Sequence, residues 1–368
     1  MKICFVITAL GYGGAEVLLK NLCNHLAGEH ELHVLHLKPL DDLASQFDSR
    51  VHRVSLGLDQ GTPNRIRSYI RAIQPDVINT HLGHADLLTM WALRRRKHLM
   101  VLTLHNVFYT KTWRDRVYFQ LYRLGLHRLH PHAHLTGVSP ATVRHATRVY
   151  RLPKYRRHYI PNAIPENFPK PDPVACREGL QIDHQTFVVL FVGRLSKQKA
   201  VYRLIEAIAQ LKQEGSHGNM VVMLLGEGEL RPALETLCRH RQVTQQVHFC
   251  GTSPHPERYM AAADVLVLPS LFEGLPTVVL EAFRQHLPVI ASRVDGNKDL
   301  IQNEENGLLF DPEQEGALAA CMLRLRNHPA LRSRLAQAAY ESFRTDYTIK
   351  RYAEHLLGLF RQMIDSKV

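Results

Sequence analysis

Two glutamates, Glu273 and Glu281, stand eight positions apart in the segment SLFEGLPTVVLEAFRQHLP, residues 270–288. Glu273 begins a Glu-Gly-Leu-Pro turn, and Glu281 lies in the helical pattern that follows, with Pro276 expected at the first helical position. Carboxylates accept hydrogen bonds from hydroxyl groups, and the N-terminus of a helix attracts anions. The spacing therefore predicts a site for a ligand that carries both hydroxyls and an anionic group.

Two cations, Arg194 and Lys199, stand five positions apart in GRLSKQKA, residues 193–200, around a second strand-to-helix turn. Cations in such a place can face a diphosphate. A ligand that is both a diphosphate and a polyol is a nucleotide sugar. The sequence has no D-x-D pair to hold a divalent cation. We therefore expect metal-independent chemistry, with no metal site and no cofactor, in which the cations neutralise the leaving diphosphate.

Polar or glycine-rich residues follow other apolar runs as well. GYGGAE (11–16) comes after the first run, His105 ends another, and GEGE (226–229) follows a third. In open α/β sheets, ligands bind at the carboxyl ends of the strands, so these positions are candidates for binding. Glu16 stands where G-x-G-x-x-G would have its third glycine, which disfavours a nicotinamide dinucleotide.

The elements that must position these residues are short apolar strands alternating with helical patterns. Such near-continuous apolar strands are typical of parallel sheets covered by helices on both faces, which predicts an α/β fold of two doubly wound, Rossmann-like domains. Strands are expected at 2–8, 31–37, 76–81, 100–105, 134–139, 187–193, 220–226, 247–250, 264–269 and 288–292. Helices are expected at 14–27, 83–95, 112–126, 313–327, 329–345 and 349–365.

The division between the domains is expected in a segment that holds five prolines from Pro161 to Pro173. A chain of 368 residues is long enough for two cores. We expect an N-terminal domain of residues 1–165 and a C-terminal domain of residues 166–348. Two such domains facing each other across a cleft could hold a substrate between them.

The net charge of +12 is unevenly distributed. Residues 1–165 contain 23 Lys and Arg against 10 Asp and Glu, a net +13, and the rest of the chain is near neutral. A solvated surface, nucleic acid and an anionic lipid surface are three possible explanations. No nucleic-acid-binding motif accompanies the charge, so no nucleic acid is expected as a partner. The basic clusters lie at Arg94–Lys97, Lys111–Arg116 and Arg148–Arg157.

Cysteine and histidine spacing argues against a metal centre. The six cysteines show no C-x-x-C pair, which is typical of reduced thiols in a cytosolic protein. Four histidines at 127, 130, 132 and 134 have no partnering cysteine or carboxylate, and a solvated helix end is the expected interpretation. No apolar run approaches the roughly 18 residues that span a bilayer. The apolar N-terminus is interpreted as a first buried strand rather than a signal peptide.

The chain resembles glycosyltransferase family 4, the retaining transferases of the GT-B fold. The resemblance lies in GGAE (13–16), GRLSKQKA (193–200), GEGELRPALE (226–235), SLFEGLPTVVLEAF (270–283) and NGLLF (306–310). It implies a donor-binding C-terminal domain and an acceptor-binding N-terminal domain. It also implies that the last helix, within 349–368, packs on the N-terminal domain.

The resemblance assigns catalytic roles to His105, Arg194, Lys199 and Glu273. His105 and Glu273 would contact the donor sugar, and Arg194 and Lys199 would neutralise the diphosphate. Glu281 would hold the ribose hydroxyls, and the GEGE loop would line the nucleobase pocket. The donor-binding residues it implies are Gly13, Gly14, Gly193, Gly226, Gly228, Leu275, Pro276, Thr277, Val278 and Glu281. Ala200 and Asp295 depart from the family pattern, which has glycine at both positions.

The resemblance implies a retaining transferase that moves a sugar from a nucleotide-diphosphate sugar, with UDP the usual nucleotide. The acceptor would be a lipid-linked glycan, a polysaccharide or a lipopolysaccharide. With the basic N-terminal half, it predicts a cytoplasmic protein attached peripherally to the inner face of the membrane. The alternatives are a nucleotide-sugar epimerase of the same fold and a non-catalytic nucleic-acid-binding module.

Overall fold

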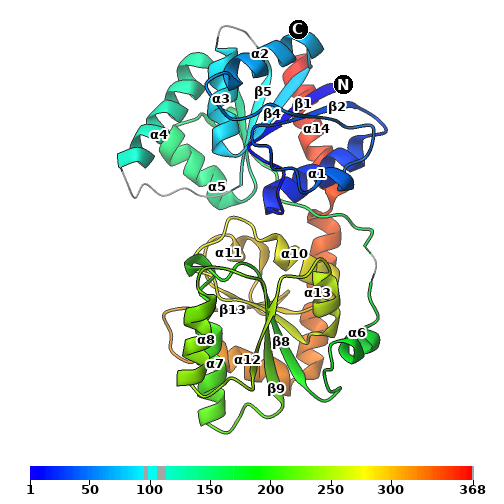
Figure 1. The fold of residues 1–368 in the computed structure, drawn as a ribbon, viewed down its shortest axis with the longest axis vertical. Coiled ribbons are helices and arrows are strands. Elements are labelled where there is room, and N and C mark those ends of the chain that lie inside the picture. The colour runs from blue at the N-terminus through cyan, green and yellow to red at the C-terminus, as the bar shows by residue number, and fades with distance from the viewer. Residues whose placement is uncertain (95–97, 106–112, 169, 367–368) are drawn as a thin grey trace. The chain divides into compact units, whose positions relative to one another are not determined.

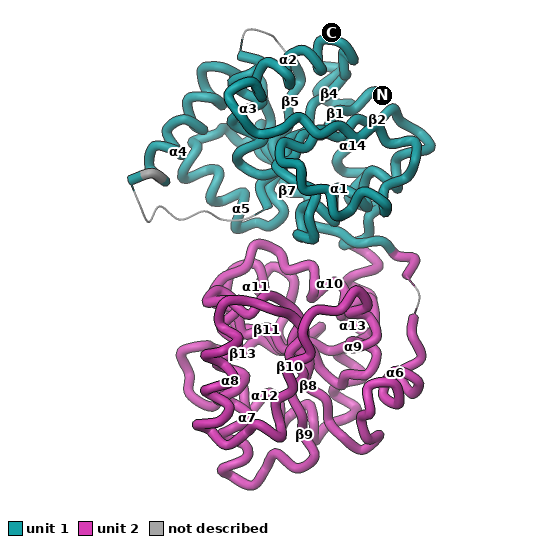
Figure 2. Tube along the Cα trace, viewed as in Figure 1, with its two compact units in different colours: residues 1–165, 347–368 teal, residues 166–346 magenta. Residues whose placement is uncertain are grey.

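The structure is a computed structural model that describes residues 1–94, 98–105, 113–168 and 170–366 (Figure 1). The chain divides into two compact units (Figure 2). Unit 1 comprises Met1–Pro165 and Tyr347–Val368, and unit 2 comprises Glu166–Asp346. Each unit contains one parallel sheet with helices packed against it, so the predicted α/β class is confirmed. Among the described residues, no helix is both long and apolar enough to cross a membrane.

The sheet of unit 1 has seven strands in the order β3-β2-β1-β4-β5-β6-β7, all parallel. Its central strands are buried on both faces, which explains their near-continuous apolar sequences. The strands are β1 (Lys2–Ile7), β2 (Glu31–His36), β3 (His52–Ser55), β4 (Val77–His81), β5 (Met100–Leu104), β6 (His134–Gly137) and β7 (Arg157–Tyr159).

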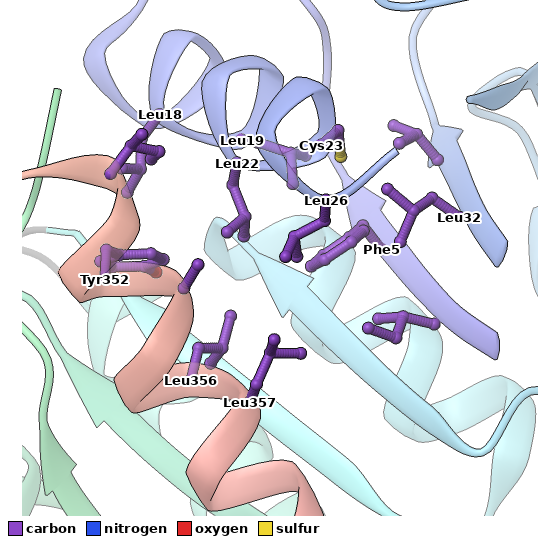
Figure 3. Packing of buried hydrophobic residues seen from close by; sticks show 14 of the residues in the cluster. Phe5, Leu18, Leu19, Leu22, Cys23, Leu26, Leu32, Tyr352, Leu356 and Leu357 are labelled. Atoms are coloured by element: carbon purple, nitrogen blue, oxygen red, sulfur yellow. The ribbon is translucent and has the colours of Figure 1, made fainter. Parts of the chain in front are cut away.

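Helices from both ends of the chain cover the sheet of unit 1. The last helix, α14, packs against α1, and both contribute to one core cluster with Phe5 of β1 (Figure 3). Tyr352, Leu356 and Leu357 of α14 face this core, so the C-terminal helix belongs to the N-terminal unit. The helices of unit 1 are α1 (Gly14–Leu26), α2 (Thr62–Ile73), α3 (Gly83–Leu93), α4 (Trp113–Leu124), α5 (Pro140–His145) and α14 (Ile349–Asp365).

The sheet of unit 2 has six parallel strands in the order β10-β9-β8-β11-β12-β13. Its strands are β8 (Phe187–Val192), β9 (Met220–Leu225), β10 (Val247–Gly251), β11 (Val265–Leu268), β12 (Val289–Ser292) and β13 (Leu308–Phe310). Its helices are α6 (Pro173–Gly179), α7 (Tyr202–Gln213), α8 (Arg231–His240), α9 (Pro256–Ala262), α10 (Thr277–Arg284), α11 (Asn297–Leu300), α12 (Ala317–Asn327) and α13 (Pro329–Asp346).

The strand order decides which loops become neighbours. In unit 2, β8 pairs with β9 on one side and with β11 on the other, so the loops that follow these three strands leave the same edge of the sheet. In unit 1, β4 pairs with β5, and His81 and His105 stand at their carboxyl ends. Residues distant in sequence are therefore brought together at the edges where parallel sheets bind ligands.

Candidate active site

Lys199 and Glu273 form an ion pair in unit 2. The Lys199 Nζ lies 2.6 Å from the Glu273 Oε1, which also accepts a hydrogen bond of 2.5 Å from the Ser270 hydroxyl. Glu273 and Ser270 are buried, and Lys199 is mostly so. Two residues assigned catalytic roles by resemblance are thus in contact. Ser270, which was not identified from the sequence, orients the Glu273 carboxylate toward Lys199.

The loop after β8 is attached to the loop after β11 by hydrogen bonds on either side of this pair. The Leu271 amide donates to the Gln198 carbonyl at 2.8 Å, and the Gln198 side chain donates to the Phe272 carbonyl at 3.0 Å. Ala200 adopts a left-handed backbone with φ of 47°. Glycine adopts that conformation without strain, which accounts for the family's glycine at this position. The sequence departs from the family here while the backbone keeps the conformation.

A third loop, after β12, supports the turn that carries Glu273. Gly296 has φ of 84°, and a Cβ on it would lie 2.5 Å from the carbonyl oxygen of Gly274. The Ser292 hydroxyl donates to the Ser270 carbonyl at 2.6 Å, and the Asn297 side chain donates to the Ser292 carbonyl at 2.9 Å. The position of the Glu273 carboxylate is therefore held by buried polar contacts from the neighbouring strand.

Gly193, Gly226 and Gly228 allow the loops after β8 and β9 to pack closely on each other. A Cβ on Gly226, where φ is 142°, would collide with the Gly193 carbonyl, and one on Gly228 would collide with that of Leu195. Hydrogen bonds of 2.9 Å join the Gly193 amide to the Leu225 carbonyl and the Leu195 amide to the Glu227 carbonyl. The close packing of the two loops therefore accounts for glycine at these positions without any contact to a ligand.

Helix α10 begins one residue later than the sequence indicated. Pro276 has φ of −73° and ψ of 114°, so it is the N-cap residue and Thr277 is the first helical residue. The expectation of Pro276 as the first helical residue is wrong because the chain is still extended there. Leu275 is buried beneath the turn. Thr277, Val278 and Glu281 are half-buried, while Val279, Leu280, Ala282 and Phe283 face the core.

Glu281 is a carboxylate in a poorly solvated position. Burial raises its pKa to about 7, the positive charge of Arg284 lowers it, and Glu257 raises it further. Among the described residues, none donates a hydrogen bond to this carboxylate. A half-buried acceptor of this kind has capacity for donors from a ligand, such as hydroxyl groups.

Arg194 differs from Lys199 in its surroundings. It is exposed, and no carboxylate of the described residues lies within ion-pair distance of its guanidinium. Its backbone belongs to the loop after β8 that also carries Lys199. One of the two motif cations is therefore already paired within the protein, and the other is open to solvent.

His105 lies in unit 1, at the carboxyl end of β5, and is buried. Its Nε2 is 2.9 Å from the Nδ1 of His81, and the His81 Nε2 is 3.0 Å from the Asn79 Oδ1. Burial lowers the pKa of His105 to about 4, and burial and the neighbouring His105 lower that of His81. Both imidazoles are therefore neutral at physiological pH. Asn106 and the residues up to 112 lie outside the described residues.

Gly13 and Gly14 begin helix α1 in unit 1, with Gly13 as the N-cap residue. The Glu16 carboxylate folds back over Gly13, so that a Cβ on Gly13 would collide with it. Burial raises the pKa of Glu16, and a hydrogen bond from its own amide lowers it. Gly13 and Gly14 were predicted to bind the donor, and in this structure the Glu16 side chain of the same helix lies at this N-terminus.

The histidines of residues 127–134 only partly form the predicted solvated helix end: His127 and His132 are exposed, whereas His130 is buried and His134 is half-buried. His130 is buried and donates from Nε2 to the Met90 carbonyl at 2.9 Å. The His134 Nδ1 lies 2.9 Å from the Nε2 of His158, its neighbour on β7. Within the described ranges, no group of three or more His, Cys, Asp or Glu side chains is arranged to hold a metal ion.

Comparisons with known sequences follow the division into two units. The family described as Glycosyl transferases group 1 matches residues 175–342, and Glycosyltransferase Family 4 matches residues 12–168. The Rhizobium meliloti lipopolysaccharide core biosynthesis glycosyltransferase LpsD is 32% identical over 52% of this chain and 54% of the relative. The alpha-D-kanosaminyltransferase of Streptomyces kanamyceticus is 30% identical over 59% of this chain and 57% of the relative. The chain thus spans little more than half of each.

A longer match is more distant. A Campylobacter jejuni alpha-1,4-N-acetyl-D-galactosaminyltransferase, whose name specifies a glycan on PP-undecaprenol, is 25% identical over 99% of both chains. Among solved structures, Anabaena HepE in complex with UDP has a TM-score of 0.87 at 18% identity, covering 98% of this chain and 100% of HepE. The lipopolysaccharide glycosyltransferase WaaG has a TM-score of 0.77 at 19% identity, covering 97% and 100%. These likenesses show a shared fold of two parallel α/β sheets, the GT-B fold.

Proposed function

Because the chain belongs to the glycosyltransferases of group 1 and family 4, we propose that it is a retaining enzyme that transfers a sugar from a nucleotide-diphosphate sugar to a glycan acceptor. The observation that carries the proposal is the Lys199–Glu273 pair, oriented by Ser270; the same loop also carries Arg194, which is exposed and has no carboxylate partner among the described residues. Cations and a carboxylate at the carboxyl ends of adjacent parallel strands suit a ligand that is both anionic and hydroxylated.

Unit 2 is assigned the donor in this proposal. An ammonium group has three N–H donors, so Lys199 can keep Glu273 as a partner and still donate to diphosphate oxygens. Arg194 adds the second positive charge as the diphosphate leaves. Glu273 accepts from sugar hydroxyls with its remaining lone pairs, and Glu281 accepts from ribose hydroxyls. Thr277 and Val278 begin α10 beside Glu281, where unpaired backbone amides favour an anion.

UDP is the nucleotide we propose for the donor. HepE, which shares the fold, has been solved with UDP and with UDP-glucose. The loops after β9 and β10, with Gly226 and Gly228, would line the base. We also propose that the transfer needs no metal ion, because Arg194 and Lys199 supply positive charge for the leaving group and the sequence has no D-x-D pair.

Unit 1 is assigned the acceptor, and we propose that it docks on an anionic lipid surface on the cytoplasmic side of a membrane. Two observations support a lipid-linked acceptor. Residues 1–165 have a net charge of +13, and the name of the Campylobacter relative specifies a glycan linked to undecaprenol. Within the basic cluster Arg148–Arg157, the side chains of Arg148, Arg151 and Lys154 are exposed. Residues 95–97 and 111–112 of the other two clusters lie outside the described residues.

Arg156 must be removed from the predicted docking surface. It is buried, and its guanidinium donates to the carbonyls of Ala133, Leu126 and His130 at 2.7–3.2 Å. This arginine satisfies the carbonyls at the end of the segment after α4 and has a structural role. Its charge is therefore unavailable to lipid.

Helix α4 supplies an apolar contribution to the same surface. Trp113, Val117, Leu121 and Leu124 are 70%, 49%, 52% and 49% exposed, at spacings of four, four and three residues. They form a single apolar stripe, while Phe119 and Tyr122 face the core. Arg116 and Arg128 are exposed on the same segment. An exposed apolar stripe with nearby cations is typical of helices that lie in a lipid interface.

The function is tested by incubating the protein with a panel of nucleotide sugars, with and without membrane lipid extract. Nucleotide release that depends on the extract supports the transferase. Isomerisation of the sugar without acceptor would favour the epimerase alternative. Absence of turnover together with salt-sensitive DNA binding would favour the nucleic-acid-binding alternative.

The membrane proposal is tested by co-sedimentation with vesicles. Binding to phosphatidylglycerol vesicles should exceed binding to phosphatidylcholine vesicles and weaken with salt, because surface charges are screened over about 8–10 Å. Val117→Ser should weaken binding, whereas Val174→Ser, at a 52% exposed valine of unit 2, should leave it unchanged. Equal pelleting with both vesicles, or an equal effect of the two variants, would contradict the proposal.

A further inference from the structure

A buried chain of hydrogen bonds joins Asn79, His81 and His105 at the edge of the sheet of unit 1. The Asn79 Nδ2 lies 3.0 Å from the Val101 carbonyl oxygen and 3.0 Å from the Thr103 hydroxyl. A carbonyl oxygen can only accept, so the amide nitrogen of Asn79 must face it. The Asn79 Oδ1 consequently faces His81, at 3.0 Å from its Nε2.

The orientation of Asn79 determines where the protons of both histidines lie. An amide oxygen can only accept, so the His81 Nε2 carries a proton and donates it. A neutral imidazole has a single N–H, which leaves the His81 Nδ1 as an acceptor. The His105 Nε2, 2.9 Å from that atom, must then be the donor. The remaining nitrogen of neutral His105, Nδ1, carries a lone pair.

Charging His81 would break this chain. A protonated His81 would offer N–H groups at both nitrogens, and its Nδ1 would no longer accept from His105. Both rings are buried, His81 fully, and burial disfavours the imidazolium form. The neutral arrangement is therefore maintained across the physiological range of pH.

We infer that Asn79 and His81 are positioning residues that hold His105 in the tautomer protonated on Nε2, so that its Nδ1 accepts a hydrogen bond from a ligand hydroxyl. The tautomer follows from unit 1 alone; that the ligand is the donor sugar rests on the proposed function. A lone pair at this position accepts from a hydroxyl and repels a carboxylate. His105 accordingly favours a neutral hexose over the corresponding uronic acid at the position it contacts.

The tautomer is tested by nitrogen NMR of protein labelled with ¹⁵N-histidine, with the His105 signals identified by their loss in His105→Phe. We expect an unprotonated Nδ1 and a protonated Nε2 in the protein without ligand. A proton on Nδ1 would overturn the inference. This measurement requires neither substrate nor activity.

The positioning role is tested with substitutions at His81. His81→Leu removes the acceptor and should let His105 populate both tautomers, whereas His81→Asn places an amide oxygen near the former Nδ1 and should restore one. His84→Leu, at an exposed histidine two residues into the next element, is the matched control and should change nothing. A single unchanged tautomer in His81→Leu would overturn the role. Asn79→Leu gives an independent test if His81→Leu does not fold.

The ligand is tested with UDP-glucose, UDP-glucuronic acid and UDP as probes. UDP-glucose should shift the His105 Nδ1 signal, and UDP should not. His81→Leu should weaken UDP-glucose binding about twofold, because equal population of the two tautomers leaves about half of the molecules with an acceptor at Nδ1, and should leave UDP binding unchanged. Equal shifts with UDP and UDP-glucose would overturn the hydroxyl contact. Failure of all three probes to bind would count against the proposed function, while the tautomer measurement would stand.

Discussion

The ammonium of Lys199 lies 2.6 Å from the carboxylate of Glu273, across 74 residues of sequence, because β8 and β11 are neighbours in the sheet. Ser270 donates to the same carboxylate oxygen. The pair combines a structural role, since each charge is the other's partner, with the proposed contact to the donor diphosphate. Substitutions can separate the two roles.

Removing one member of the pair should destabilise the protein, and removing both should not. Lys199→Met and Glu273→Leu each leave a poorly solvated charge unpaired, at a cost of about 2 kcal/mol, less than for a fully buried pair. The double variant removes both charges and should regain most of the melting temperature. Its kcat should remain at least about a hundredfold below wild type, because the loss of even one preorganised charge typically has that effect. Recovery of activity together with stability would show that Lys199 is only structural.

Arg194→Ala should reduce activity without affecting stability. The side chain is exposed and has no carboxylate partner among the described residues, so its loss disturbs little of the fold. Charge on the leaving diphosphate grows in the transition state, so kcat should fall about a hundredfold while donor binding weakens less. Thermal melting and steady-state kinetics on the same preparation provide the test. A lower melting temperature with unchanged kcat would contradict it.

Donor binding should depend on the ionisation of Glu281. Its pKa is raised to about 7, first by burial, and the ionised carboxylate accepts hydrogen bonds from hydroxyls more strongly than the protonated group does. UDP-glucose should therefore bind more weakly at pH 6 than at pH 8, and Glu281→Gln should abolish this difference. Calorimetric titrations at both pH values measure it. An equal pH dependence in Glu281→Gln would exclude Glu281 as the group responsible.

The same pKa shift predicts that Glu281 destabilises the free protein at high pH. Between its ordinary pKa of 4.5 and about 7, the folded state retains a proton that the unfolded state has lost, so stability falls as pH rises. Glu281→Gln should then melt at a higher temperature than wild type at pH 8, and the difference should disappear below pH 4.5. A variant that melts lower than wild type at pH 8 would contradict the assignment of the shift to burial.

Gly226→Ala should destabilise unit 2 more than Gly215→Ala does. Both glycines have positive φ, but a Cβ on Gly226 would collide with the Gly193 carbonyl, whereas nothing lies within 4 Å of one on Gly215. The strain of the backbone alone costs about 1 kcal/mol, and the collision adds to it. Equal melting temperatures for the two variants would show that the loops after β8 and β9 separate easily.

The central strands of both sheets could be predicted from the sequence because burial on both faces produces continuous apolar runs. The edge strand β3 reads HRVS and β7 reads RHY, and these polar sequences gave no such signal. β13 has only three residues, LLF, and was noticed as part of a motif rather than as a strand. The strands that the sequence did not predict, β3, β7 and β13, therefore all lie at the edges of the sheets.

The candidate site was predictable in its residue types and less so in its contacts. Strand-end positions and family motifs identified Lys199 and Glu273, but not that they pair or that Ser270 joins them. His81 gave no signal because only the pairing of β4 with β5 brings it to His105. The spacing of residues likewise could not predict that the Glu16 side chain lies against the backbone of Gly13. Contacts of these kinds depend on strand order and rotamers, which no local pattern specifies.

In the reaction we propose, the sugar itself moves from a nucleotide diphosphate to an acceptor without a metal ion. The most direct measurement follows label from a UDP-sugar radiolabelled in the sugar into membrane lipid extract, in buffer with EDTA. We expect incorporation of label by wild type and about a hundredfold slower incorporation by Arg194→Ala. Release of nucleotide without incorporation of label, or incorporation that appears only when Mg²⁺ or Mn²⁺ replaces EDTA, would contradict this proposal.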